Sequence, residues 1–319
     1  MLPKKNNKLT KTLIGLGEYL ISFVAIYFIV RLTLNNWYQI QGQITSIKFG
    51  ALLASLIAFI LSLFIQGVAW FYLHKKIGKK VRFFELLYAY YASNIVRYIP
   101  GNIWSYLMRL RKNKKLGVSE SETLYLSLIE IIFFLISSWI VFILSIFFWT
   151  EPLVFSNKYT VLFIVSILFI IFAIFSPRIV KWYIKKYMHG HNISFAFIKL
   201  PWHNLIKIFL IYFIYWAIAG LGLYFSLLSI YYLTPTLLIV IFGINAVAWL
   251  IGFVSFITPS GIGAREPALI FFLVSYIPTS IAGAISIISR LIMVISEIVI
   301  LFLVKLITVI LYDKKNEKK

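Results

Sequence analysis

Long apolar runs alternate with short polar segments along most of the chain. An α-helix needs roughly 20 apolar residues to cross about 30 Å of hydrocarbon. Runs that approach or exceed this length cover residues 12–33, 46–73, 121–149, 159–176, 205–231, 234–258 and 279–311. The pattern predicts an all-α polytopic membrane protein with about six full transmembrane helices.

A further apolar segment, residues 84–108, is interrupted by the stretch NIVRYIPGNIW, residues 94–104. Pro100 removes a helical hydrogen bond, and Gly101 and Asn102 follow it in a stretch that favours a turn. Arg97 adds a charge that costs about 2.5 to 3.5 kcal/mol at the centre of a membrane helix. Irregular backbone at this depth is tolerated only where protein buries it or a watery cavity borders it, so the segment predicts a cavity.

The distribution of basic residues sets the expected topology. Most of the 31 Lys and Arg residues fall into clusters at residues 4–11, 75–82, 109–115, 178–207 and 314–319. Short loops rich in Lys and Arg stay in the cytoplasm, so both termini are expected to be cytoplasmic. Residues 84–108 have a basic cluster at each end, which favours a re-entrant hairpin. The alternative is a Pro-kinked span with one basic cluster on the outer side.

A second break occurs in the stretch VSFITPSGIGAREPAL, residues 254–269. Pro259 ends an apolar run about half the chain length after the first break, and Gly261 and Gly263 follow it. The flanking stretches YYLTPT and SYIPTS carry no basic residue, which favours extracytoplasmic ends. We therefore expect a second hairpin from the opposite face and an inverted repeat, an architecture that transporters use. The alternative is that residues 234–258 cross fully and the second turn is cytoplasmic.

These boundaries divide a single integral membrane domain, residues 1–319, into successive parts. We expect a first span and outer loop at 1–45, repeat 1 at 46–149 with its hairpin at 84–108, a connecting span and basic cytoplasmic loop at 150–204, repeat 2 at 205–311 with its hairpin at 234–277, and a cytoplasmic tail at 312–319.

Composition and charge narrow the function classes. The chain is 61% hydrophobic and 13% charged, with a mean hydropathy of +0.93, so it lacks the polar surface of a soluble globule. The formal net charge of +21 follows the loops and attracts anionic lipid, so no nucleic-acid partner is expected. The absence of cysteine excludes disulfides and thiolate metal sites. No Walker motif, dinucleotide fingerprint or carboxylate-rich metal motif occurs, so neither a cofactor nor a metal is expected.

Charged residues inside the apolar runs define the candidate site. Such residues face the interior of a helix bundle, where they pair or line a substrate path. Arg290 and Glu297 are seven residues apart and share one face of a helix. The alternative reading is that the charges form structural ion pairs that fasten the hairpins to their neighbours. No catalytic residue is expected, and the candidates for substrate binding or translocation are Arg97, Pro100, Gly101, Asn102, Glu130, Pro259, Gly261, Gly263, Arg265, Glu266, Arg290 and Glu297.

The sequence also resembles a known family. The stretches RYIPGNIW at 97–104, LGVSESETLYLSLIE at 116–130 and TPSGIGARE at 258–266, with the late Arg290, look like the lysylphosphatidylglycerol synthase transmembrane family, also described as flippase-like domain proteins. The most specific element is Pro-x-Gly-x-Gly-x-Arg-Glu, matched here by residues 259–266. Fuller members join this membrane domain to a cytoplasmic aminoacyl-transfer domain, and other relatives are linked to polyprenyl-phosphate sugars. The chain ends at Lys319, so the resemblance implies the membrane part without the transfer domain.

The resemblance and the two breaks together predict a flippase-like protein in the cytoplasmic membrane of a bacterium or archaeon. The expected substrate is an anionic or aminoacylated phospholipid, or a polyprenyl-phosphate-linked glycan, that moves between leaflets. Arg97, Arg265 and Arg290 are expected to receive phosphate, and the glutamates to hold the arginines or meet a cationic headgroup. One alternative is an enzyme or enzyme subunit in lipid headgroup modification, by phosphatidylglycerol aminoacyl transfer, with a separate soluble transferase as partner. Another is a structural partner of a glycan or lipid synthesis complex.

Overall fold

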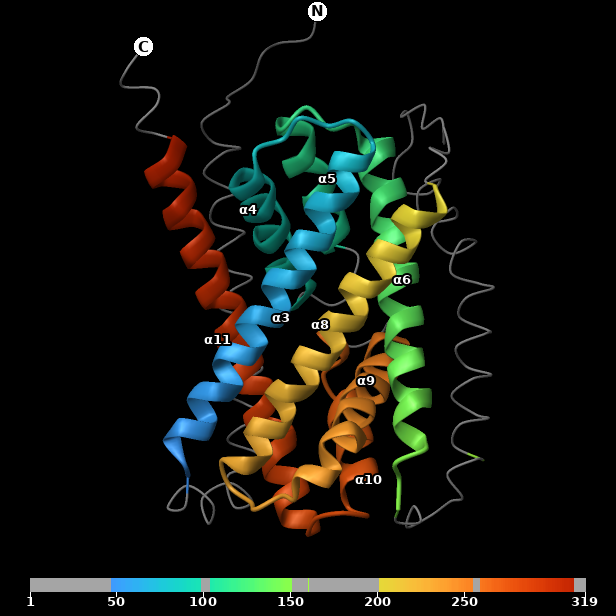
Figure 1. Ribbon diagram of the computed structural model, residues 1–319. Helices are drawn as coiled ribbons and strands as arrows, with labels where there is room; N and C mark the ends of the chain where they lie inside the picture. Colours follow the sequence, from blue (N-terminus) through green and yellow to red (C-terminus); the bar gives the residue numbers. More distant parts are fainter. Residues whose placement is uncertain (1–46, 99–103, 151–159, 161–200, 255–258, 313–319) are drawn as a thin grey trace, which may run out of the picture.

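The computed structural model describes residues 47–98, 104–150, 160, 201–254 and 259–312. Within these ranges the regular elements are eight α-helices and three short 3-10 turns, with no strand (Figure 1). The expected span at 12–33 and nearly all of that at 159–176 lie outside the described residues.

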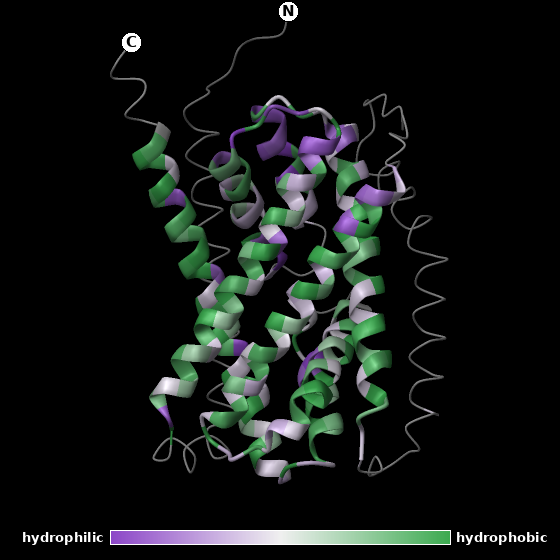
Figure 2. Ribbon diagram, in the orientation of Figure 1, coloured by the Kyte–Doolittle hydropathy of each residue, from purple (hydrophilic) through white to green (hydrophobic). Residues whose placement is uncertain are grey.

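Among the described residues, five helical segments are long and apolar enough to cross a membrane. They are α3 (Phe49–Lys76), α6 (Glu120–Ile146), α8 (Trp202–Leu228), α9 (Leu238–Val254) with the preceding turn η2 (Pro235–Leu237), and α11 (Thr279–Tyr312). The apolar runs that predicted them are thus confirmed as helices. Figure 2 shows their middle sections as mostly hydrophobic and the upper end of the molecule as strongly polar. The chain is a multi-pass helical membrane protein.

The outer surface of α3 illustrates how these helices suit a hydrocarbon environment. Phe49, Leu53 and Ile57 lie four residues apart and are exposed along one stripe. The same helix buries Ser55, whose hydroxyl donates to the carbonyl of Gly222 in α8 at 2.7 Å. Apolar groups outside and small polar groups between helices are typical of packing in membranes, where lipid tails solvate the exposed stripe.

Three helices of the described ranges are too short to cross a membrane. They are α4 (Phe83–Asn94), α5 (Trp104–Lys115) and α10 (Arg265–Leu273). The 12 residues of α4 or α5 extend only about 18 Å at 1.5 Å per residue. Figure 1 shows α4 and α5 in the upper part of the bundle and α10 in the lower part. The structure thus has a pair of short helices near one end and a short helix near the other.

The two chain breaks meet inside the bundle. The turn η1 (Ile95–Tyr98) follows α4, and the turn η3 (Pro259–Gly261) precedes α10. The two turns contact each other, and Tyr98 packs with Ile262 and with Val294 of α11. Segments far apart in the sequence therefore place their irregular backbone side by side.

Glycine permits the close packing at the second break. Gly261 has a φ of +69°, and a Cβ built on it would lie 2.7 Å from the carbonyl oxygen of Gly252 in α9. A side chain at this position would therefore clash with backbone and would also strain its own φ angle. Gly252 in turn faces Arg265, since a Cβ on it would lie 3.1 Å from the Cβ of Arg265. The glycines thus bring the start of α10 directly against the end of α9.

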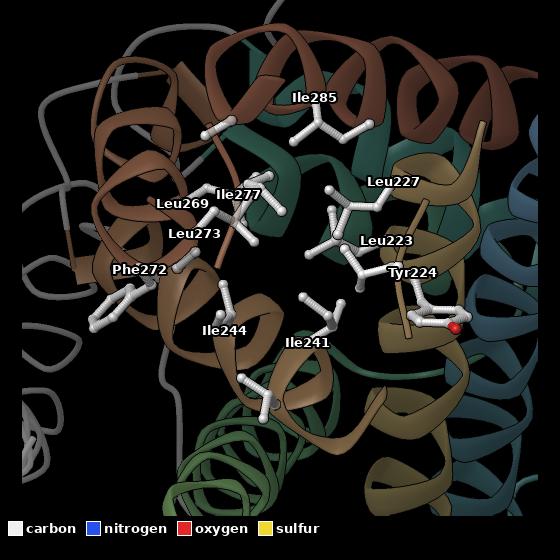
Figure 3. Packing of buried hydrophobic residues seen from close by; sticks show 14 of the residues in the cluster. Leu223, Tyr224, Leu227, Ile241, Ile244, Leu269, Phe272, Leu273, Ile277 and Ile285 are labelled. Atoms are coloured by element: carbon white, nitrogen blue, oxygen red, sulfur yellow. The ribbon is translucent and has the colours of Figure 1, made fainter. Parts of the chain in front are cut away.

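The lower part of the bundle is closed by an apolar core. Figure 3 shows side chains of four helices that point toward one another, and they come from α8, α9, α10 and α11. The labelled residues include Leu223 and Leu227 of α8, Ile244 of α9, Phe272 of α10 and Ile285 of α11. This core packs α10 against the first and middle turns of α9, and thereby fixes the charged residues at the start of α10.

Candidate functional site

The six charged candidate residues lie inside the bundle. Five are buried, and the side chain of Arg97 is 22% exposed. They form two groups. Glu130 belongs to one group, between α4, α5 and α6. The other, which we call the central cluster, lies at the two breaks and α11, and consists of Arg97, Arg265, Glu266, Arg290 and Glu297.

Glu266 and Arg290 form a buried ion pair that fastens α11 to the second break. The Nε of Arg290 donates to Oε1 of Glu266 at 2.7 Å, and its Nη2 lies 2.5 Å from the same oxygen. The backbone N–H of Gly263 donates to Oε2 at 2.7 Å, and Nη1 of Arg290 donates to the carbonyl of Ser260 at 3.1 Å. Gly263 has a φ of +88°, which turns its N–H toward the carboxylate.

Arg97 and Glu297 form a second ion pair that fastens α11 to the first break. Nη2 of Arg97 donates to Oε1 of Glu297, and the hydroxyl of Tyr98 donates to Oε2 at 3.3 Å. Arg290 and Glu297 share the inward face of α11, as their spacing predicts. Arg290 pairs with Glu266 at the second break, and Glu297 pairs with Arg97 at the first. Both breaks are therefore held to α11, which supplies the cation of one pair and the anion of the other.

Arg265 is the exception in the central cluster. Its side chain is fully buried, and none of its three guanidinium nitrogens has a hydrogen-bond acceptor among the described residues. The guanidinium carbon lies 5.3 Å from the centroid of the Trp249 ring, and that of Arg97 lies 5.9 Å from the same ring. The central cluster thus contains three arginines and two glutamates, and the guanidinium in excess is the one without a partner.

Glu130 pairs with Arg109, which was not among the candidate site residues predicted from the sequence. Its two carboxylate oxygens accept from Nη1 of Arg109 and from the hydroxyl of Tyr90, and Nη2 of Arg109 donates to Oδ1 of Asn94 at 2.6 Å. The guanidinium of Arg109 also lies 4.6 Å from the ring centroid of Trp70. Arg109 is only 4% exposed, so within the basic cluster 109–115 it is a buried partner of Glu130 and not a solvent-facing charge.

A helical reading of residues 104–115 would have found Arg109. Ser105, Arg109 and Asn113 lie four residues apart and are all buried, while the basic residues Arg111, Lys114 and Lys115 are exposed. The number of Lys and Arg residues in a segment indicates which side of the membrane it lies on, and it does not indicate which of their side chains point into the bundle.

A small cavity lies between the two groups. It is lined by Leu63, Tyr91, Asn94, Ile95, Arg97 and Glu297. Asn94 accepts from Arg109 on one side, and Arg97 and Glu297 form the ion pair on the other. The cavity is thus bordered by a residue of the Glu130 group on one side and by an ion pair of the central cluster on the other.

The remaining candidates are only partly described. Pro100, Gly101 and Asn102 lie outside the described residues, so the turn of the first break is not placed. Pro259 begins η3. Across the described ranges, no group of three or more His, Cys, Asp and Glu residues has the arrangement of a metal site.

The fold and the site define a class: a polytopic helical membrane protein with two chain breaks that meet around a buried arginine-rich cluster. The sequence model of the lysylphosphatidylglycerol synthase TM region matches residues 15–300. The chain belongs to this family, as its motifs at both breaks indicated, and the match concerns the membrane part. None of the curated proteins compared with the chain matches it.

Proposed function

We propose that this protein moves lipids that carry a phosphate in the headgroup between the leaflets of the membrane, or assists that movement. The observation that carries the proposal is the fully buried Arg265 guanidinium with no acceptor among the described residues. The substrate is an anionic or aminoacylated phospholipid or a polyprenyl-phosphate-linked glycan, and in each case the shared feature is a phosphate.

The charge of the central cluster favours an anionic ligand. Arg97 is matched by Glu297 and Arg290 by Glu266, whereas Arg265 has no matching carboxylate in the part of the chain that the structure describes. A buried charge without a partner is strongly destabilising, because the cost of removing it from water is not repaid. A lipid phosphate at Arg265 would bring the cluster to neutrality, and its oxygens would accept the charge-assisted hydrogen bonds that the guanidinium offers.

The two breaks supply the path in this proposal. We assign α4 and α5 to a re-entrant hairpin from the cytoplasmic face, and α9 and α10 to a second hairpin from the opposite face, related as an inverted repeat. The short lengths of α4, α5 and α10 and the contact between η1 and η3 support this assignment. The headgroup would cross at the breaks, where irregular backbone borders polar groups, while the lipid tails stay in hydrocarbon.

The two ion pairs have a separate role in this mechanism. They hold the breaks to α11 while the site is empty, and an incoming phosphate competes for their arginines as it passes. Arg265 is then the first contact of the phosphate, and Arg97 and Arg290 are later contacts.

Purified protein in lipid vesicles tests the proposal. Tail-labelled phosphatidylglycerol should move between leaflets several times faster than in protein-free vesicles, and a tail-labelled glycolipid without phosphate should not be accelerated, because it has no phosphate to bind Arg265. The assay measures the fraction of label that an impermeant reductant reaches, with and without an imposed membrane potential. Equal rates with and without protein under both conditions would remove the proposal.

A further inference from the structure

Asn245 in α9 is a second buried polar side chain without partners. It is fully buried, and neither its Nδ2 nor its Oδ1 has a hydrogen-bond partner among the described residues. Nearby serines do not supply one, since Ser138 donates to the carbonyl of Ala246 and Ser145 donates to that of Phe142. Leaving a buried amide unsatisfied is costly, so an amide at this position needs an explanation.

The position of Asn245 relates it to Arg265. Asn245, Trp249 and Gly252 are spaced four and three residues apart and therefore lie on one face of α9. The Cβ of Arg265 lies opposite Gly252, and its guanidinium lies over Trp249. The Arg265 side chain thus extends along this face toward Asn245, which is the next turn of α9, about 6 Å further along the axis.

We infer that Asn245 is a specificity-determining residue that binds a hydroxyl of the same headgroup whose phosphate contacts Arg265. The inference rests on the proposed function and names the chemical class of its substrate: a phosphodiester whose headgroup carries hydroxyls. Lipids of this class are found with a glycerol headgroup and with a sugar headgroup.

The hydrogen-bonding capacity of an amide leads to this class. The Oδ1 of Asn245 needs a donor and its Nδ2 needs an acceptor. A hydroxyl is both donor and acceptor, so a diol can satisfy the two atoms together. A primary ammonium satisfies only Oδ1, and a quaternary ammonium or a methyl group satisfies neither. A site built to bind a hydroxyl rejects an analogue that lacks it, because its own polar atoms then stay unpaired.

Two short-chain lipids of equal charge test the inference. Phosphatidylglycerol and phosphatidylmethanol both carry one phosphodiester charge, and only the first has headgroup hydroxyls. Titrated into purified full-length protein, phosphatidylglycerol should bind about tenfold more tightly, as expected for a hydrogen-bonded pair against an unsatisfied one. A prenyl phosphosugar and the corresponding prenyl methyl phosphate form a second matched pair. The hydroxylated lipid that binds more tightly identifies the source of the headgroup.

Two variants separate this inference from the proposal beneath it. In Asn245→Leu the new side chain has a similar shape and no polar atoms. This variant should therefore bind the hydroxylated lipid of each pair as weakly as the wild-type protein binds the hydroxyl-free one. Arg265→Met should lose affinity for all four lipids. Equal binding of hydroxylated and hydroxyl-free lipids by the wild-type protein, or an unchanged preference in Asn245→Leu, would overturn the role of Asn245. If the Asn245→Leu variant does not fold, the comparison of hydroxylated and hydroxyl-free lipids with the wild-type protein alone decides. Unchanged binding by Arg265→Met would instead overturn the proposed anion site.

Discussion

Replacing Arg265 with methionine is expected to abolish the movement of anionic lipid while raising the stability of the protein. Methionine fills a similar volume without a charge, so the buried and unpartnered guanidinium disappears. Substitution of buried charges by apolar side chains of similar size can stabilise a protein by about 1 to 4 kcal/mol. Thermal unfolding in detergent and the vesicle assay measure the two effects. A functional residue that opposes stability is the expected pattern for a binding site.

The matched control is Arg290→Met, which removes an arginine of the same cluster that does have a partner. Here the buried Glu266 loses its ion-pair partner and keeps the backbone N–H of Gly263 as a hydrogen-bond donor, so the protein should lose stability. Removing one partner of a buried pair costs about 3 to 5 kcal/mol. The two arginine variants should therefore shift the unfolding temperature in opposite directions. If Arg265→Met lowers it as much as Arg290→Met does, Arg265 has a structural partner and is not an empty anion site.

Removing the carboxylate of Glu130 is expected to give the largest loss of stability outside the central cluster. Glu130→Ala leaves Arg109 buried with only Asn94 as acceptor and also deprives Tyr90 of its acceptor. The free energy of unfolding should fall by about 3 to 5 kcal/mol, the range for an uncompensated buried charge. The aromatic rings around Arg109 offset only part of this loss, since a cation–π contact contributes about 0.5 to 2 kcal/mol.

The double variant Arg109→Met with Glu130→Leu is the control for this pair. It removes both charges together and should recover most of the stability lost on removing one of them, and a double-mutant cycle with the single variants Arg109→Met and Glu130→Leu measures the coupling energy. The same variant decides between two interpretations of Glu130. If the pair only fastens α5 to α6, the double variant should still move lipid in vesicles. Loss of movement in a stable double variant would place Glu130 on the substrate path.

The sequence predicted the helices of the described spans and the burial of the charged residues, and both have one physical cause. Hydrocarbon excludes polar groups, so apolar runs become helices and any charge within them turns inward. The runs at 46–73, 121–149, 205–231, 234–258 and 279–311 all contain helices of the expected kind. Glu130, Glu297 and the charges at the second break are buried for the same reason.

The pairing of those charges could not be predicted from the sequence. Glu297 and Arg97 are 200 residues apart, and they meet because the first break lies against α11. Such contacts depend on how the short helices stack, which no local pattern encodes. The Arg265 guanidinium without a partner could be recognised only once the other two arginines had been assigned to their glutamates.

Asn245 was overlooked for a different reason. It is the single Asn or Gln in the apolar run 234–258, and an uncharged side chain in such a run does not by itself indicate a site. Its spacing from Trp249 was visible in the sequence, but the relevance of that face follows from the packing of Arg265 against it. A buried amide becomes informative when its hydrogen-bond partners can be counted.

The central claim is that the two breaks form one polar path open toward opposite sides of the membrane. Single cysteines at Asn102 and Ser260 test it most directly, because the chain has no cysteine of its own and each variant reports one position. A membrane-impermeant thiol reagent is applied from one side at a time to protein in sealed vesicles. The account predicts that position 102 is labelled from the cytoplasmic side and position 260 from the outer side. Labelling of position 260 only from the cytoplasmic side would make the second break an inner turn and would contradict the opposed hairpins.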